Sequence, residues 1–300
     1  MLLKLFYKLT NSQKYQNYKI KKRITVNKDF FKDKLENYLI NIQEILLKKK
    51  EINFLHSGHT GDIINILPII KKLSETHKCN LFLQINLPAP SEYNDHPAGN
   101  VFLNERIYKM LLPLLKFQKY INKVELYNRQ NIDINFDKFR ELPINILFDN
   151  MRYGMHIAGI QPNLNEDFIT AETNHKFKNS ILLLRSLRYQ NYFINYKFLE
   201  KYENTYYIGV RDEYEQLKKE INNLKFYDCK DFLEMASIIK SSKIFIGNSS
   251  LGFDIAEGLK IPRLLEASPD FPARQVHGKN GFDFYFQTHF EKYFKFFMEK

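Results

Sequence analysis

The sequence has few cysteines and no long apolar segment. Its two cysteines, Cys79 and Cys229, lie far apart and belong to no CxxC or Cys/His pattern. This excludes a disulfide framework and a zinc site of the usual spacing. No run of about 18 or more uncharged apolar residues occurs, so no transmembrane helix is expected. Because the N-terminus also lacks the apolar segment of a secretion signal, the cytoplasm is the expected location.

Acidic residues are scarce near the N-terminus. The net charge is +11, but residues 1–50 alone hold 13 Lys and Arg against 4 Asp and Glu. The other 250 residues hold 32 basic and 30 acidic side chains, a balance typical of an enzyme that acts on small molecules. The positive charge therefore belongs to an N-terminal extension. Since this extension carries no recognisable nucleic-acid-binding motif, no nucleic acid is expected as a partner.

The basic extension, residues 1–50, contains two apolar patterns. Residues 1–9 place leucines and Phe6 beside Lys4 and Lys8, a pattern that fits an anionic membrane surface but is short for that role. Asp29 begins a predicted amphipathic helix with apolar residues on one face. We expect both patterns to pack on the first domain. The alternative is attachment to the inner face of an anionic membrane.

Residues 52–73 predict a strand, a tight turn and a helix. An apolar run from Ile52 to Leu55 is followed by the segment SGHTGD and then by apolar residues at helical spacing. Such a unit opens a parallel α/β domain, in which ligands collect where strand ends meet helix N-termini. Asp62 lies at that point. Its carboxylate is either a helix cap or a functional group in a cleft.

Strands and helices alternate through the rest of the chain in two blocks. The strands predicted after residue 73 lie at 80–86, 124–127, 144–148, 181–184, 206–210, 243–246 and 261–265, with helices at 104–118 and 194–201 among others. Because the polar, pattern-free segment 163–179 separates the blocks, it is the predicted linker. This places one Rossmann-like domain at 51–162, a second at 180–275, and a Phe-rich C-terminal helix within 276–300.

Residues 243–267 predict a second ligand-binding turn. A buried strand runs into the tetrapeptide GNSS, and a helix follows up to Leu259. Small hydroxyl residues at a helix N-terminus let backbone N–H groups approach phosphate oxygens closely. The segment is thus a candidate diphosphate-binding turn, although Ser and Asn are also ordinary helix caps. The residues expected to bind the diphosphate group here are Asn248, Ser249, Ser250 and Gly252.

The segment GDIINILP resembles the opening motif of glycosyltransferase family 9, the bacterial lipopolysaccharide heptosyltransferases. The resemblance implies a glycosyltransferase B fold, in which two Rossmann-like domains face a central cleft, here with a basic helical extension at the N-terminus. In that family the Asp of the GD pair is taken as the general base, which implies that Asp62 is catalytic. The residues expected on the acceptor side are His59, Thr60, Gly61 and Arg152. No metal site is expected at His56 and His59, because no further ligand pattern supports them.

The second half of the chain carries the same resemblance. The segment around GNSS resembles the family's donor-site motif, and also the GNSS motif of the nonhydrolysing nucleotide-sugar 2-epimerases, which share the fold. Two positions depart from the family pattern: Lys260 stands where Gly is common, and Asp254 stands about where the heptosyltransferases tend to have His. The residues that the resemblance implies for the diphosphate are Arg185 and Arg188, and those for the ribose hydroxyls are Glu213 and, less closely matched, Glu257.

The resemblance implies an inverting glycosyltransferase that needs neither metal nor other cofactor. It would move a sugar from a nucleotide diphosphate-sugar, with ADP-heptose as one candidate, to a hydroxyl of a cell-surface glycan or lipid-linked acceptor. Asp62 would take the hydroxyl proton. The last helix would pack back on the first domain and bury its Phe side chains. Two alternatives stay open: a nucleotide-sugar 2-epimerase, which needs several carboxylates and a histidine in the cleft, and a non-catalytic nucleotide-binding or interaction protein.

Overall fold

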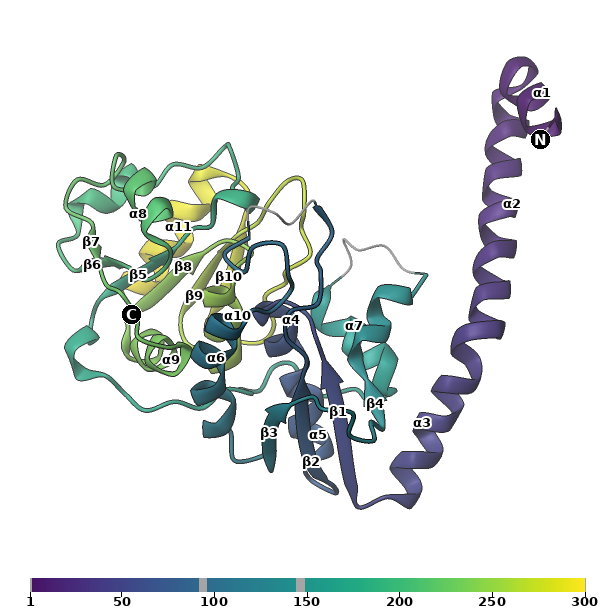
Figure 1. The fold of residues 1–300 in the computed structure, drawn as a ribbon. Helices are drawn as coiled ribbons and strands as arrows, with labels where there is room; N and C mark the ends of the chain where they lie inside the picture. Colours follow the sequence, from purple (N-terminus) through teal and green to yellow (C-terminus); the bar gives the residue numbers. More distant parts are fainter. Residues whose placement is uncertain (1, 92–95, 144–148, 300) are drawn as a thin grey trace.

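The chain contains two parallel β-sheets, one from each half of the sequence (Figure 1). The computed structural model describes residues 2–91, 96–143 and 149–299. The first sheet has the strand order β3-β2-β1-β4, and the second has the order β10-β9-β8-β5-β6-β7. All paired strands in both sheets run parallel. Two parallel sheets with crossover helices confirm the predicted α/β fold class with two Rossmann-like parts.

The first sheet is built around β1, which lies between β2 and β4. The elements of this half are β1 (Glu51–His56), α4 (Thr60–Asn65), α5 (Leu67–Leu73), β2 (Lys78–Leu83), α6 (Glu105–Phe117), β3 (Lys123–Leu126), β4 (Ile134–Asn135), a 3-10 helix (Phe136–Glu141) and α7 (Asn150–Ala158). The helix predicted after β1 is divided at Ile66, because Pro68 has no N–H to continue the ladder. The strand predicted at 144–148 lies outside the described residues.

The second sheet begins after the predicted linker. Its half contains β5 (Ile181–Leu184), β6 (Thr205–Tyr207), α8 (Arg211–Leu217), β7 (Lys225–Phe226), α9 (Phe232–Ser241), β8 (Ile244–Gly247), α10 (Leu251–Leu259), β9 (Arg263–Glu266), β10 (Gly281–Phe284) and α11 (Gln287–Met298). The edge strands β7 and β10 were not predicted. The helix expected at 194–201 is only a 3-10 helix over Lys197–Lys201.

The C-terminal helix α11 packs on the second sheet. Phe290, Phe294 and Phe297 are buried in an apolar cluster with Tyr196 and Phe284, all from the second half of the chain. The rings of Phe284 and Phe290 stack with their centroids 4.2 Å apart. The expectation that this helix packs back on the first domain was therefore wrong. Its apolar face instead covers β9 and β10, the strands that precede it.

The two halves meet where helices of one contact helices of the other. α4 contacts α10 and α6 contacts α9, and one apolar cluster continues from the first sheet into the second half. The linker reinforces this contact, since Tyr120 at the end of α6 donates to the carbonyl of Phe168 at 2.6 Å. The backbone N–H groups of Phe168 and Ile169 donate in turn to the carbonyl of Gly258, at 2.8 and 3.0 Å.

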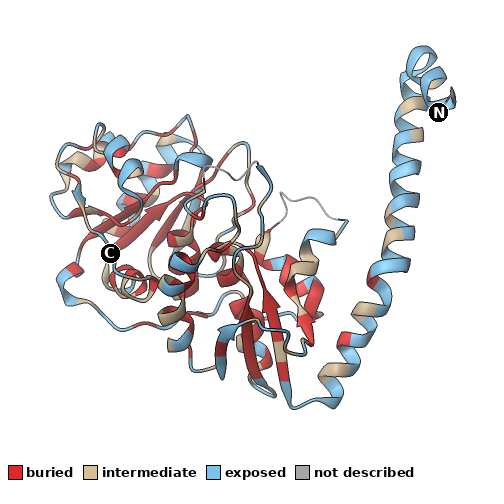
Figure 2. Cartoon of the chain, viewed as in Figure 1, coloured by how far each residue is buried: buried red, intermediate tan, exposed pale blue. Residues whose placement is uncertain are grey.

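Most of the N-terminal extension is helical, and only its last part joins the body. It consists of α1 (Leu2–Thr10), α2 (Ser12–Phe30), a π-helical turn (Phe31–Leu35) and α3 (Glu36–Lys48). α3 packs on the first domain as expected: Leu35 and Ile42 are buried, and Tyr38 donates to the carbonyl of Asn135 at 3.2 Å. α2 buries no residue and projects away from the body with α1 at its far end, so the expected packing of residues 1–9 on the first domain was wrong (Figures 1 and 2). Among the described helices, none has the length and apolarity needed to cross a membrane.

Candidate active site

A large cavity lies between the two halves of the chain. It has a volume of about 1130 Å³ and is lined by residues from both sheets' loops and helix N-termini. From the first half, His59, Thr60, Gly61 and Asp62 reach it, in the turn between β1 and α4. These are three of the four expected acceptor-side residues together with the expected base. The cavity lies at the carboxyl ends of parallel strands, where ligands of open α/β sheets bind.

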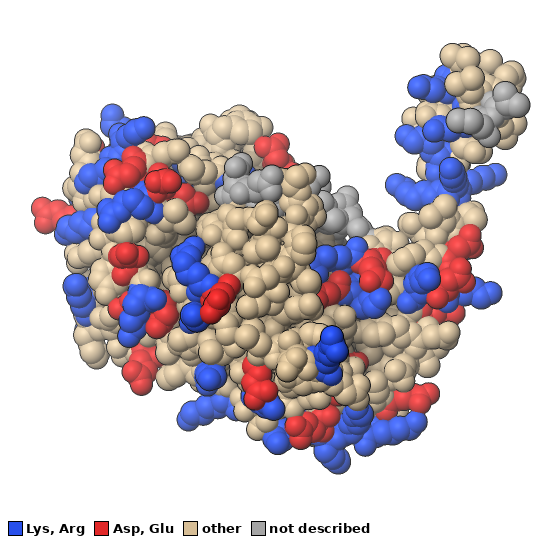
Figure 3. Space-filling model, viewed as in Figure 1, with Lys and Arg blue, Asp and Glu red and all other residues tan. Residues whose placement is uncertain are grey.

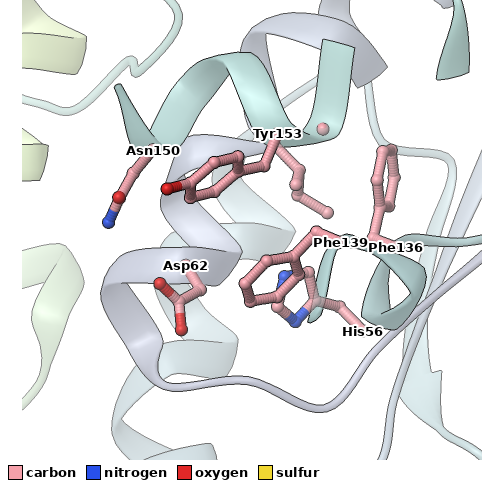
Figure 4. Close-up of a pocket in the computed structure, with 8 residues that line it drawn as sticks. His56, Asp62, Phe136, Phe139, Asn150 and Tyr153 are labelled. Atoms are coloured by element: carbon pink, nitrogen blue, oxygen red, sulfur yellow. The ribbon is translucent and has the colours of Figure 1, made fainter. Parts of the chain in front are cut away.

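Asp62 lies in the first turn of α4, at the wall of the cavity. Its carboxylate points toward open space beside Asn150 and Tyr153, while aromatic rings close the other side (Figure 4). The ring of Tyr153 stacks on Phe139, with centroids 5.7 Å apart. A carboxylate at a cavity wall, with apolar surface behind it, can accept a proton from a hydroxyl held in front of it.

The histidines near Asp62 have different partners. His56 is buried and accepts a hydrogen bond from the N–H of Gly58 at 2.8 Å. The Nδ1 of His59 lies 2.8 Å from the carbonyl oxygen of Phe102, and its ring stacks on His96 with centroids 3.8 Å apart. Burial lowers the pKa of His56 and of His59, and lowers the pKa of His96 to about 3. All three rings are therefore neutral near pH 7.

The expected diphosphate-binding turn faces Asp62 from the second half. Ser249 and Ser250 line the cavity between β8 and the first residue of α10. Asn248 does not line it; its side chain accepts from the N–H of Ser186 at 2.8 Å and donates to the Ser186 carbonyl at 2.6 Å. Gly252 lies against β5, since a Cβ there would be 2.6 Å from Leu184 Cδ1. These two residues hold the turn in place, and Ser249 and Ser250 present it to a ligand.

Arg188 and Glu213, the candidates for the diphosphate and the ribose hydroxyls, also line the cavity. Arg188 follows β5, and its charge lowers the pKa of both His59 and His96, so it lies near the first half across the cleft. Glu213 lies in the first turn of α8 and accepts a hydrogen bond from Tyr207 Oη at 2.9 Å. A cation and a carboxylate are thus available to a ligand from neighbouring strand ends.

Arg185 and Glu257 are not at the cavity, and their assignments are corrected. Arg185 is buried and makes two hydrogen bonds to Glu266, from Nε at 2.7 Å and from Nη2 at 2.9 Å. Glu257 is fully buried and accepts from Arg263 Nε at 2.6 Å and from Lys260. Buried carboxylates require such partners, so both residues belong to structural ion pairs. The remaining candidate, Arg152, lies outside the cavity lining, with its Nε 3.6 Å from Asp149 Oδ2.

The sequence did not predict an ion pair between Asp254 and Arg274 beside the catalytic candidate. Arg274 lines the cavity, with its Nε 2.7 Å from Asp254 Oδ1 and its Nη2 3.0 Å from Oδ2. A Cβ on Gly61 would lie 2.5 Å from Asp254 Oδ2 and 2.7 Å from Arg274 Nη2, so the pair directly faces the residue before Asp62. Asp254 had stood out as a departure from a motif. Arg274 lies in an irregular segment, where no pattern could have identified it.

Two Rossmann-like halves that face a cleft define the glycosyltransferase B fold. The particular structures that the chain resembles include the glycosyltransferase of family 9 from Veillonella parvula, at 9% identity and a TM-score of 0.52, with 84% of this chain and 89% of that one covered. They also include the E. coli heptosyltransferase WaaC with ADP, at 9% identity and a TM-score of 0.51, with 82% and 99% covered. At these identities the likeness concerns the fold. No protein-family model and no curated protein matches the sequence.

Proposed function

We propose that this protein is an inverting, metal-independent glycosyltransferase. It moves a sugar from a nucleotide diphosphate-sugar to a hydroxyl of a cell-surface glycan or lipid-linked acceptor. One observation carries the proposal: Asp62 from the first half, and Ser249 and Ser250 from the second, line the same cavity of about 1130 Å³. A cavity of this size accommodates a nucleotide-sugar together with part of an acceptor.

Asp62 is the proposed catalytic base. The acceptor hydroxyl attacks the anomeric carbon, forms the new C–O bond as the bond to the diphosphate oxygen breaks, and loses its proton to Asp62. General base catalysis of this kind contributes about 10²–10⁴-fold to the rate. Because the base and the leaving group belong to different walls of the cavity, attack occurs on the face opposite the diphosphate. One displacement of this geometry inverts the anomeric configuration.

The leaving diphosphate is stabilised by the second half. The turn that leads into α10 offers backbone N–H groups at Ser249 and at the N-cap Ser250, and a helix N-terminus favours negative charge. Arg188 and Arg274, which line the same cavity, supply two cations. These groups stabilise the charge that develops as the sugar departs, which is the role a metal ion plays in other transferases.

The nucleoside is proposed to bind between α8 and α9. The cavity wall there includes the apolar side chains of Phe226, Phe232 and Met235, and Glu213 lies near them for the ribose hydroxyls. An aromatic and apolar slot suits a purine or pyrimidine ring. An adenine nucleotide such as ADP-heptose is the first donor to test, because WaaC, a protein of the same fold, was solved with ADP.

The test begins with the native protein and a panel of nucleotide-sugars. A true donor is expected to raise the melting temperature and, with an acceptor, to release a nucleoside diphosphate. Asp62→Asn is then expected to lower kcat by about 10²–10⁴-fold while the dissociation constant for the donor changes little. Asp283→Asn, a change of the same kind at an exposed position of β10, is the matched control and should leave kcat unchanged.

Three results would contradict the proposal, each in a different way. Full transfer activity in Asp62→Asn would exclude this residue as the base. Conversion of a nucleotide-sugar without acceptor and without release of nucleotide would indicate an epimerase instead, for which the cavity offers further carboxylates at Asp212, Glu213 and Asp228. Failure of every nucleotide and nucleotide-sugar to stabilise the protein would indicate an interaction protein.

A further inference from the structure

The first two helices form an arm in which none of residues 3–30 is buried. We call residues 2–30, which comprise α1 and α2, the N-terminal arm. α1 folds back on α2, where the rings of Tyr7 and Tyr18 meet with centroids 6.4 Å apart, and Asn11 caps α2 by accepting from the N–H of Lys14 at 2.8 Å. No residue of α2 is buried, and the arm stands away from the body (Figures 1 and 2).

The N-terminal arm carries positive charge with almost no compensation. Residues 2–28 hold eight Lys and Arg and no Asp or Glu. Figure 3 shows these basic side chains along the arm, with acidic ones appearing only farther down, toward the body. In α3, by contrast, Lys48 pairs with Glu44 at 2.8 Å. Like charges on one exposed helix repel one another, so the arm is suited to a negatively charged partner.

The tip of the N-terminal arm also exposes an apolar face. Leu5, Phe6 and Leu9 are 58%, 59% and 77% exposed, and they share one side of α1 because they stand three and four residues apart. Lys4 and Lys8, which are four residues apart, flank this apolar face along one edge. Since Tyr7, on another side again, makes the contact with α2, the apolar face points away from α2 and has no cover among the described residues.

We propose that the N-terminal arm binds the surface of an anionic lipid bilayer. Leu5, Phe6 and Leu9 enter the interface between head groups and acyl chains, and the lysines of α1 and α2 contact the anionic head groups. A short apolar helix binds a bilayer weakly by itself, and a basic segment next to it supplies the second contribution. This inference does not depend on sugar transfer.

Two other occupants fit the N-terminal arm less well. A second copy of the chain would bring another strongly basic arm against the first, at an electrostatic cost. A nucleic acid would satisfy the lysines but would leave the leucines of α1 exposed, because a phosphate backbone offers no apolar surface. A bilayer with anionic lipid satisfies both features of the arm at once.

The test uses the full-length protein and vesicles without any sugar donor. Because the chain contains no Trp, Phe6→Trp introduces a single indole into α1. With vesicles of phosphatidylcholine and phosphatidylglycerol at a ratio of about 7:3, its emission is expected to shift to the blue and the protein to cosediment. With pure phosphatidylcholine, or at about 1 M salt, both effects should be lost.

Two groups of variants separate the apolar and the charged contributions. Leu5→Ser with Leu9→Ser is expected to weaken binding about 10-fold or more without changing the charge. A variant with Lys19→Gln, Lys21→Gln, Lys22→Gln and Arg23→Gln is expected to bind more weakly at low salt, and its binding should depend less on the salt concentration. The control for the apolar variant is Tyr192→Ser with Phe193→Ser, and the control for the charge variant is Lys197→Gln, Lys201→Gln, Lys279→Gln and Lys292→Gln. All of these positions are exposed on the body.

Each possible result decides the matter. Binding to anionic vesicles that only the variants of the N-terminal arm weaken supports the proposal. Equal binding by the arm variants and the native protein overturns it, as does failure of the native protein to bind. Concentration-dependent self-association, or binding to a nucleic acid in preference to anionic vesicles, would also overturn it and would identify one of the two other occupants.

Discussion

Two arginines three residues apart, Arg185 and Arg188, have different environments after β5. Arg185 is buried, with Glu266 as its partner and its guanidinium 4.8 Å from the centre of the Tyr196 ring. Arg188 lines the cavity instead. The first residue therefore stabilises the fold, and the second is available to a ligand. Both arginines were predicted to bind a ligand because both follow the end of a predicted strand. This position is the same for the two, so it could not show which of them is buried.

Replacement of the two arginines should separate stability from binding. Arg185→Met leaves Glu266 buried without its charged partner, which typically costs about 3–5 kcal/mol of unfolding free energy. Arg188→Met should change stability by no more than about 0.5 kcal/mol. It should nevertheless weaken binding of a nucleoside diphosphate by about 10-fold or more, since a charged hydrogen bond is lost. Urea unfolding and calorimetric titration measure the two effects, and similar effects of both variants on stability would contradict the distinction.

Asp254 links the candidate site to pH. Burial raises the pKa of Asp254 to about 7; the charge of Asp62 adds to the shift, and Arg274 opposes it. In the unfolded chain the carboxyl has a pKa of about 3.9, so between about pH 4 and 7 the folded protein binds more protons than the unfolded one. The contribution of this raised pKa to the unfolding free energy is therefore fully present below about pH 4, and it is lost as the pH rises to 7.

The variant Asp254→Asn tests this pH dependence. Asn cannot ionise, so the variant should become steadily more stable relative to the native protein between about pH 4 and 7, with no further change above. Urea unfolding at several pH values, followed by circular dichroism, gives the difference in unfolding free energy. Taking the difference cancels the other titrating groups. A difference that stays constant from pH 4 to 7 would mean that Arg274 keeps the carboxylate charged over this range.

At the scale of elements, the C-terminal helix shows how a local pattern leaves its partner undetermined. The spacing of Phe290, Phe294 and Phe297 predicts an amphipathic helix, and α11 buries all three. Which sheet they cover depends on where β9 and β10 lie. These strands form one edge of the second sheet, directly before α11 in the chain, and the short connection from β10 brings the helix back over them.

Truncation of α11 side chains should reflect this packing. Phe294→Ala removes a ring that contacts Phe198 and Tyr202, and such a change typically costs about 3–5 kcal/mol. Phe286→Ala, at a position 56% exposed, is the control and should cost little. Hydrogen exchange should show the loss of protection spreading to β9 and β10 first. If it appeared first in β1 and β2, α11 would belong with the first sheet.

At the scale of the whole molecule, the linker connects the two halves closely. A Cβ on Gly258 would lie 2.6 Å from Ile169, so the linker packs directly on α10. Tyr120 and Gln118 at the end of α6 hydrogen-bond the same segment through Phe168 and Thr170. The apolar cluster is continuous across this contact. The halves should therefore unfold together.

Ile169→Ala tests this coupling. The substitution leaves a cavity between α6, α10 and the linker, so we expect a loss of about 2–5 kcal/mol that lowers the stability of both sheets equally. Native-state hydrogen exchange of β1 and β5 measures the two halves separately. Glu172→Ala, an exposed position of the same linker, is the control. Two separate unfolding transitions in the native protein would contradict the prediction and make the halves independent.

The sequence by itself determined the local units that carry the candidate chemistry. Apolar periodicity, a Gly-containing turn and helix caps are properties of neighbouring residues, which is why Asp62, Ser249 and Ser250 were found at strand ends and why two Rossmann-like halves were predicted. The confirmed fold class rests on the same local evidence.

Only the tertiary structure decided which charged residues meet. Arg185 meets Glu266, Glu257 meets Arg263, and Asp254 meets Arg274, over separations that no sequence spacing encodes. Whether the N-terminal arm packs on the body also depends on the tertiary structure. Residues 1–57 contain no Gly or Pro to interrupt a helix, so α2 continues past the point where the body can cover it. Long-range contacts depend on the arrangement of whole elements, and local pattern alone leaves that arrangement open.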